Sequence, residues 1–81
     1  MILIVDDDRS VIASVSLLLK QAGYASCGAS APEEALAILR AERCQLVIQD
    51  MNFSRRTGGD EGLGWLRAIK ASHPGLPVVL I

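Results

Sequence analysis

Short apolar runs alternate along the chain with longer segments in which apolar residues recur every three or four positions. The clearest runs cover residues 2–5, 45–49 and 77–81, and a weaker run rich in small residues covers 24–29. An unbroken run of Val, Ile and Leu is typical of a buried parallel strand. The small residues of 24–29 favour a strand at the edge of a sheet.

A first helix is predicted at residues 9–22, where the apolar positions have helical spacing. Asp8 precedes it as a candidate N-cap, and Gly23 follows it as a candidate C′ residue. The predicted inner face of this helix consists of Val11, Ile12, Val15, Leu18 and Leu19.

Two further helices follow. Ser30-Ala31-Pro32-Glu33 predicts a helix start with a capping box between Ser30 and Glu33, and this helix is expected to end near Arg43. Asp60 or Glu61 is expected to open the third helix, which His73-Pro74-Gly75 ends. The predicted buried residues are Ala35, Leu36, Ile38 and Leu39 in the second helix and Leu63, Leu66 and Ile69 in the third.

The alternation of strands and helices predicts an α/β domain with a parallel sheet. The 81 residues suffice for one small domain. A net charge of −1 and a single basic pair, Arg55-Arg56, argue against nucleic-acid binding by this segment. No run is long enough to cross a membrane, and none resembles a signal peptide. Cys27 and Cys44 lack metal-ligand spacing, which favours reduced thiols in a cytoplasmic protein.

Carboxylates follow two of the apolar runs. Asp6-Asp7-Asp8 comes directly after the first run, and Asp50 comes within two residues of the run Leu46-Val47-Ile48. Parallel sheets have their ligand sites beyond the carboxyl ends of the strands, so neighbouring strands would bring Asp6, Asp7 and Asp50 together. Like charges in one crevice require a cation, and hard oxygen ligands suit Mg²⁺. The sequence therefore predicts an acidic, metal-binding pocket suited to phosphate chemistry.

In order and spacing these motifs resemble the receiver domain of bacterial two-component response regulators, over the whole chain. Ile-Leu-Ile-Val-Asp-Asp-Asp at 2–8 resembles the opening strand with its acidic pair, and Leu-Val-Ile-Gln-Asp at 46–50 resembles the strand that presents the phospho-accepting aspartate. The Gly23-Tyr24 turn and the Pro-Val-Val-Leu-Ile strand agree with this family. The resemblance implies a flavodoxin-like receiver fold with parallel strand order 2-1-3-4, lacking the fifth strand and the last helix, so that residues 1–81 form a partial receiver domain.

The resemblance also implies roles for individual residues. Asp50 would accept a phosphoryl group from a sensor histidine kinase or a phosphotransfer protein. Mg²⁺ would be held by Asp6, Asp7, Asp50 and the backbone carbonyl of Asn52. Phosphoryl transfer depends mainly on positioning and on neutralising charge, which a divalent ion beside the acceptor provides. The domain would not be a dedicated enzyme, although it could release its own phosphoryl group.

Two departures from the family pattern stand out. The chain stops at Ile81, so the switch Ser or Thr and the phosphate-binding Lys of the family are absent from these residues. The segment 51–59 lacks the usual Met-Pro turn and is longer than typical, a variant that resembles receivers attached to sigma-54-type transcriptional activators. An uncovered apolar strand at 78–81 predicts a homodimer or another form of self-association.

Two other functions fit part of the pattern. Asp-x-Asp after an apolar strand also opens haloacid-dehalogenase-like phosphatases, in which Asp6 would be the nucleophile and Asp8 the general acid; that assignment gives Asp50 no role. The second alternative is a pseudo-receiver, an interaction module that never takes phosphate.

Overall fold

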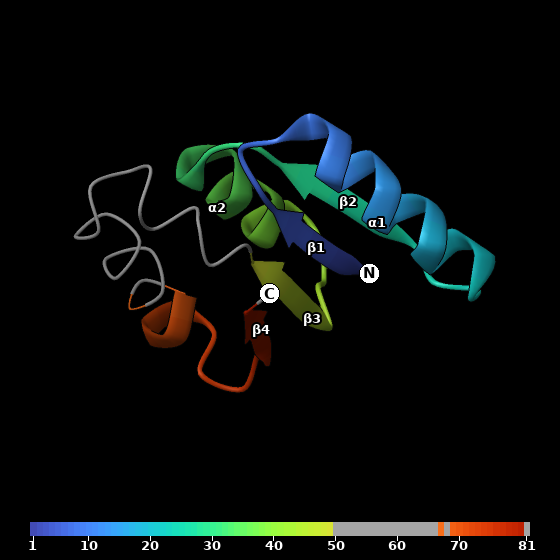
Figure 1. Ribbon diagram of the computed structural model, residues 1–81. Coiled ribbons are helices and arrows are strands. Elements are labelled where there is room, and N and C mark those ends of the chain that lie inside the picture. Colours follow the sequence, from blue (N-terminus) through green and yellow to red (C-terminus); the bar gives the residue numbers. More distant parts are fainter. Residues whose placement is uncertain (50–66, 68, 81) are drawn as a thin grey trace.

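The computed structural model describes residues 1–49, 67 and 69–80, which form a layered α/β unit (Figure 1). Its elements are β1 (Ile2–Val5), α1 (Arg9–Gln21), β2 (Ser26–Ala29), α2 (Pro32–Ala41), β3 (Leu46–Gln49) and β4 (Val78–Leu80), with helical residues 69–72 before β4. The strands form one sheet in the order β2-β1-β3-β4, and every pair is parallel. The order 2-1-3-4 predicted from the sequence is confirmed.

Strand β1 is one of the two interior strands of the described sheet. It pairs with β2 on one side and with β3 on the other, so that Val5 is level with both Ala29 and Gln49. All four residues of β1 are buried. This burial on both faces explains why the run contains only aliphatic residues.

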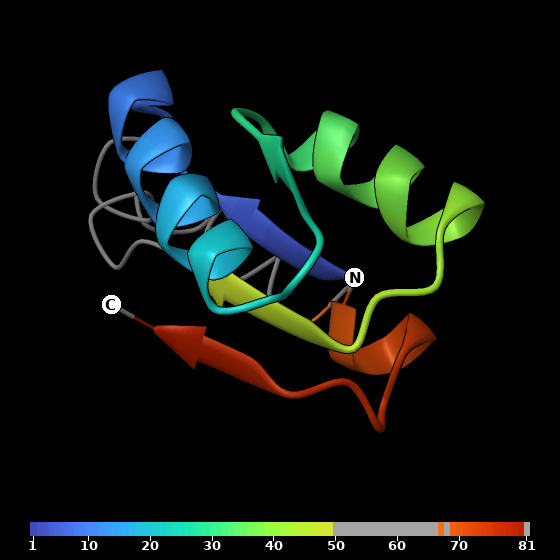
Figure 2. The same ribbon diagram turned by 90° about the vertical axis from the view of Figure 1, so that its right-hand side faces the viewer.

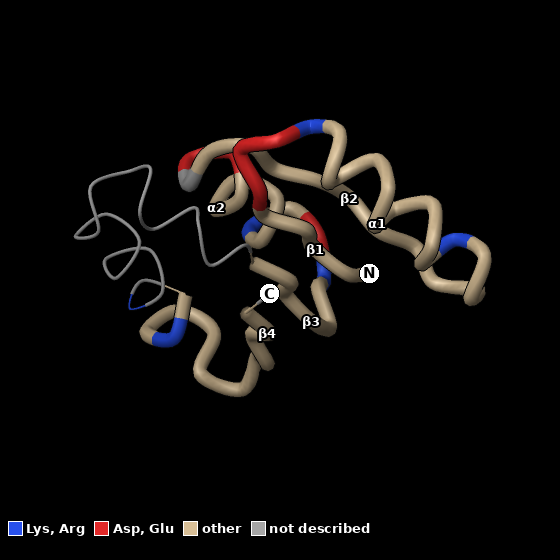
Figure 3. Tube along the Cα trace, viewed as in Figure 1, with Lys and Arg blue, Asp and Glu red and all other residues tan. Residues whose placement is uncertain are grey.

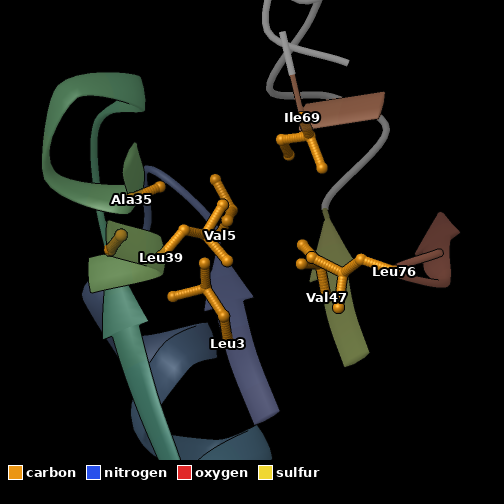
Figure 4. Close-up of a cluster of buried hydrophobic side chains, with 8 residues drawn as sticks. Leu3, Val5, Ala35, Leu39, Val47, Ile69 and Leu76 are labelled. Atoms are coloured by element: carbon orange, nitrogen blue, oxygen red, sulfur yellow. The ribbon is translucent and has the colours of Figure 1, made fainter. Parts of the chain in front are cut away.

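Helices cover both faces of the sheet. Figure 2 shows α1 on one side, and α2 with the helical residues 69–72 on the other. The α2 side holds the main apolar cluster, part of which is shown in Figure 4: Leu3, Val5, Ala29, Ala35, Leu39, Val47, Ile69 and Leu76. Leu36 and Ile38 pack against this cluster. The predicted inner face of α2 is therefore confirmed, as is the burial of Ile69, whereas Leu63 and Leu66 lie outside the described residues.

Both ends of α1 are formed as predicted. Asp8 is the N-cap, and its Oδ1 accepts a hydrogen bond of 2.9 Å from the Ser10 N–H. Gly23 follows the C-terminus with φ of 92°, a conformation that residues with a Cβ rarely adopt. Lys20 lies in the last turn, where its charge complements the helix dipole.

The predicted inner face of α1 is wrong at one position. Leu18 is 65% exposed, and no residue of α1 is fully buried. The stripe that contacts the sheet includes Ile12, as predicted, which lies against Gly28. It also includes Ser16, which was not predicted and whose Oγ is 2.7 Å from the Ser26 Oγ. A wide apolar stripe does not reveal which of its edges faces the sheet, and here β2 offers small residues that admit a hydroxyl pair.

The predicted capping box at the start of α2 is also wrong in one partner. The helix begins at Pro32 with Ala31 as the N-cap. The third helical residue is then Glu34 rather than Glu33, and its Oε2 accepts hydrogen bonds from Ser30 N and Oγ at 3.4 and 3.3 Å. Proline fits the first helical position, which moves the cap one residue beyond Ser30.

Element boundaries differ slightly from the predictions. Helix α2 ends at Ala41, because Glu42 is already extended. Strand β2 begins at Ser26 rather than at residue 24, and β3 and β4 span Leu46–Gln49 and Val78–Leu80. The predicted loop at 51–59 and the predicted start of the third helix at Asp60 or Glu61 lie outside the described residues.

Candidate acidic site at the carboxyl ends of β1 and β3

The chain changes direction across the sheet between β1 and β3. From β1 it crosses by α1 to β2 on one side, and it then returns by α2 to β3 on the other side. Ligand sites of open parallel sheets lie at such a switch point, beyond the carboxyl ends of the strands. Because Val5 is level with Gln49, the residues that follow β1 lie at this end of the sheet.

Asp6 is a buried carboxylic acid at this point. It is 3% exposed, and its N–H donates to the Ala29 carbonyl at 3.1 Å, which continues the ladder between β1 and β2. The Asp8 N–H donates to the Asp6 Oδ1 at 2.8 Å. The orientation of the Asp6 carboxyl group is therefore fixed by the turn that the acidic triplet itself forms.

The three consecutive aspartates form the acidic segment between β1 and α1 (Figure 3), and they have three different surroundings. Asp8 is exposed and caps α1, while Asp7 is half-buried between Asp6 and Asp8. A buried carboxylate is costly unless hydrogen bonds or a cation compensate its charge. With Asp8 used as a helix cap, Asp6 and Asp7 remain as the candidates for binding a cation.

Gln49 was not anticipated from the sequence as part of this region. It is 2% exposed and ends β3, one residue before Asp50. Within the described part of the chain, every buried side-chain nitrogen or oxygen has a hydrogen-bond partner. The only sequence signal was an amide at the end of the aliphatic run 46–48.

Asp50 and Asn52, the other two predicted site residues, lie outside the described residues. Among the residues that are described, no group of three His, Cys, Asp or Glu residues could hold a metal ion. The donor set of the remaining candidates nevertheless suits Mg²⁺, because Asp6 and Asp7 offer hard carboxylate oxygens at the end of β1.

The two cysteines lie away from this end of the sheet. Both are free and half-buried, and they pack against the apolar cluster on the α2 side. Burial raises the pKa of both thiols, and for Cys27 the neighbouring Cys44 and Glu42 raise it further. Neither thiol is therefore activated for nucleophilic chemistry.

Comparison with known protein families decides the identity of the fold. Residues 2–81 match the family described as the response regulator receiver domain. The chain belongs to this family. It is 34% identical over 80 residues to the C4-dicarboxylate transport transcriptional regulatory protein DctD of Rhizobium meliloti. It is 38% identical over 82 residues to the nitrogen assimilation regulatory protein NtrX of Azorhizobium caulinodans.

Solved receiver structures superpose on nearly all of the chain. A receiver domain from Bacteroides fragilis is 42% identical, with a TM-score of 0.82 over 98% of this chain and 62% of its own. The response regulator TrrA of Thermotoga maritima is 28% identical, with a TM-score of 0.81 over 98% of this chain and 65% of its own, and it was solved in complex with Mg²⁺-BeF. These matches confirm the receiver fold, and they favour neither a phosphatase nor a pure interaction module.

The chain spans only part of these relatives. Each match covers 99% of this chain but 16% of DctD and 17% of NtrX. Among the described residues, no helix is long and apolar enough to span a membrane.

Proposed function

We propose that this receiver domain accepts a phosphoryl group on Asp50, with Mg²⁺ bound by Asp6, Asp7, Asp50 and the backbone carbonyl of Asn52. The observation that carries the proposal is the burial and fixed orientation of Asp6 at the carboxyl end of β1. A buried acid at the switch point of a parallel sheet needs a cation or a hydrogen-bonded partner, and a phosphoryl acceptor needs the same cation.

The proposed reaction transfers one phosphoryl group between two proteins. A carboxylate oxygen of Asp50 attacks the phosphorus of a phosphohistidine, the P–N bond breaks, and its electron pair remains on the imidazole. The product on this chain is an acyl phosphate. When bound, Mg²⁺ supplies positive charge to the oxygens around the transferred group. Asp6 contributes a carboxylate whose Oδ1 is held in place by the Asp8 N–H, and Asp7 would add a second carboxylate to hold the cation.

The donor is proposed to be a sensor histidine kinase or a phosphotransfer protein. Because DctD and NtrX are regulatory proteins of greater length, we further propose that the domain serves a transcriptional regulator of the sigma-54-activator type in the cytoplasm. The acyl phosphate adds charge and acceptor oxygens, which can bias a neighbouring loop and so carry a signal.

Labelling with acetyl phosphate and Mg²⁺ tests the acceptor assignment. Intact mass measurement should detect one added phosphoryl group, and peptide mapping should locate it on Asp50. The variant Asp50→Asn should remain unlabelled, whereas Glu42→Gln, which changes an exposed acid at the other end of the sheet, should be labelled like the parent. Label on Asp6 would instead support the phosphatase, and absence of label would support the pseudo-receiver.

A further inference from the structure

A cavity of about 270 Å³ lies beside the carboxyl end of β2, on the α1 side of the sheet. One wall is formed by the first half of α1, and the opposite side by Ser30 and by Glu34 in the first turn of α2. Figure 2 shows the start of α1 and the start of α2 near the carboxyl end of β2, which is one of the two edge strands of the described sheet. Neither Asp6, Asp7 nor Gln49 is among the described residues that line this cavity.

The walls of this α1–β2 cavity are held in place by tight packing. A side chain at Gly28 would collide with the Ile12 Cγ2, so the helix lies directly on the backbone of β2. One turn further along α1, the Ser16 Oγ is 2.7 Å from the Ser26 Oγ. These two contacts fix α1 against β2 and leave Ile12 and Ala13 as the apolar lining.

Two side chains of opposite charge line the cavity but do not form an ion pair with each other. Arg9 and Glu34 are both exposed lining residues, yet no ion pair joins them. Glu34 is oriented by Ser30, whose N–H and hydroxyl donate to Oε2 at 3.4 and 3.3 Å. Its Oε1 makes no hydrogen bond within the described part of the chain. Among the described residues, the cavity thus presents one guanidinium without an ion pair and one oriented carboxylate beside an apolar wall.

We propose that the α1–β2 cavity binds a free α-amino acid with a short aliphatic side chain. The ligand carboxylate pairs with Arg9, whose planar guanidinium matches a carboxylate with two parallel hydrogen bonds. The ligand ammonium pairs with the Glu34 carboxylate, and the aliphatic side chain lies against Ile12 and Ala13. A ligand with one charge leaves either Arg9 or Glu34 without a partner, and a long peptide carries its terminal charges too far apart for one cavity.

The binding of L-valine to the ¹⁵N-labelled chain, followed by NMR, tests this proposal. The amide resonances of Gly28 and Ser30 should shift and saturate, with a dissociation constant on the order of 1–10 mM, because exposed ion pairs contribute little each. N-acetyl-L-valine, which lacks the ammonium, and L-valinamide, which lacks the carboxylate, should each bind about fivefold more weakly.

Variants that remove one charge test which residue binds the ligand carboxylate and which binds the ligand ammonium. Arg9→Gln should bind L-valine and L-valinamide equally, and Glu34→Gln should bind L-valine and N-acetyl-L-valine equally. Glu33→Gln is the matched control, since Glu33 is the neighbouring exposed acid of α2 and does not line the cavity. Ala13→Leu should abolish binding by filling the cavity from an exposed helical position, and circular dichroism should show that its fold is retained.

Three results would overturn the proposal. These are shifts of equal size for all three compounds, an L-valine affinity that is unchanged from the parent in both Arg9→Gln and Glu34→Gln, and a titration without saturation that leaves Gly28 and Ser30 unmoved. None of these readouts depends on phosphorylation, so this inference and the proposed acceptor function fail or succeed independently.

Discussion

Val5 and Gln49 are register partners at the carboxyl ends of β1 and β3, and both side chains are buried. Partners in neighbouring parallel strands point to the same face of the sheet, so a polar amide lies level with an aliphatic side chain of the core. The Gln49 amide is hydrogen-bonded, like every buried side-chain nitrogen or oxygen of the described residues, and it adds no charge to the core. A carboxylate at the same position would place a charge in the core.

The substitution Gln49→Glu should destabilise the domain by about 2–4 kcal/mol at neutral pH, because it introduces a carboxyl group at a buried position. Burial raises the pKa of the new carboxyl above its unfolded value of about 4.3. The loss should therefore be small below about pH 4 and should grow as the pH rises towards neutrality. Urea unfolding at several pH values measures this dependence. Gln45→Glu, at an exposed position just before β3, is the control and should change stability by less than about 0.5 kcal/mol.

The proposed metal site predicts a second set of measurements. Calorimetric titration with Mg²⁺ should show weak binding to the parent chain, and both Asp7→Asn and Asp50→Asn should remove most of it, because each deletes one charged ligand. Asp8→Asn should bind Mg²⁺ as before, since Asp8 caps α1 and asparagine is an equally good N-cap. Unchanged affinity in both of the first two variants would contradict the metal assignment.

The packing of α1 on β2 predicts a strong effect at Gly28. Gly28→Ala should destabilise the domain by about 1–3 kcal/mol, because the added Cβ would collide with the Ile12 Cγ2. Ile12→Ala removes that atom, so the two substitutions together should cost less than the sum of their separate effects. Additive effects in a double-mutant cycle measured by urea unfolding would show that α1 shifts away from β2 instead.

The sequence was sufficient where one local pattern determines one structure. Aliphatic runs identified the strands, and Asp8 and Gly23 identified the ends of α1, because a side-chain acceptor and a residue tolerant of positive φ are specific requirements. The sequence was insufficient where two neighbouring residues could fill the same role in a motif. Ser30 could be paired with either glutamate, and only the helix start at Pro32 selects Glu34.

The acidic site was predictable only in part, because its geometry depends on how separate strands and helices pack together. The register of β1 and β3 cannot be read from either strand alone, so the burial of Asp6 could be expected but not established. The exposure of Leu18 was missed because a helix with apolar residues on most of its surface has more than one possible contact face. Gln49 was missed because a single amide in an aliphatic run has no distinctive spacing.

The raised pKa values of the two half-buried thiols predict slow alkylation of the folded chain. Because burial raises the pKa of Cys27 and Cys44, iodoacetamide should modify the folded chain more slowly than the urea-unfolded chain at pH 8, and the difference should be largest for Cys27. The thiols contribute to stability while they are protonated, and this contribution should be lost as the pH rises above the unfolded thiol value. Mass spectrometry after timed quenching measures both rates. Equal rates in the folded and unfolded chains would contradict the protection of these thiols.

Exposed apolar side chains on two surfaces predict self-association of the 81-residue chain. Leu17 and Leu18 on α1 are 57% and 65% exposed, and Val79 and Leu80 on β4 are 45% and 49% exposed. Burying such side chains between two copies would remove apolar surface from water, and a symmetric dimer is the commonest closed arrangement.

Sedimentation velocity of paired variants identifies the surface responsible. If α1 forms the contact, Leu17→Lys with Leu18→Lys should yield a monomer at micromolar concentration, whereas Val79→Lys with Leu80→Lys should still associate. If strand pairing through β4 forms it, the opposite result is expected, because lysine on an edge strand opposes further pairing. Tyr24→Lys, which changes an exposed aromatic residue outside both surfaces, serves as the control. A parent chain that sediments as a stable monomer would show that neither surface holds two copies together.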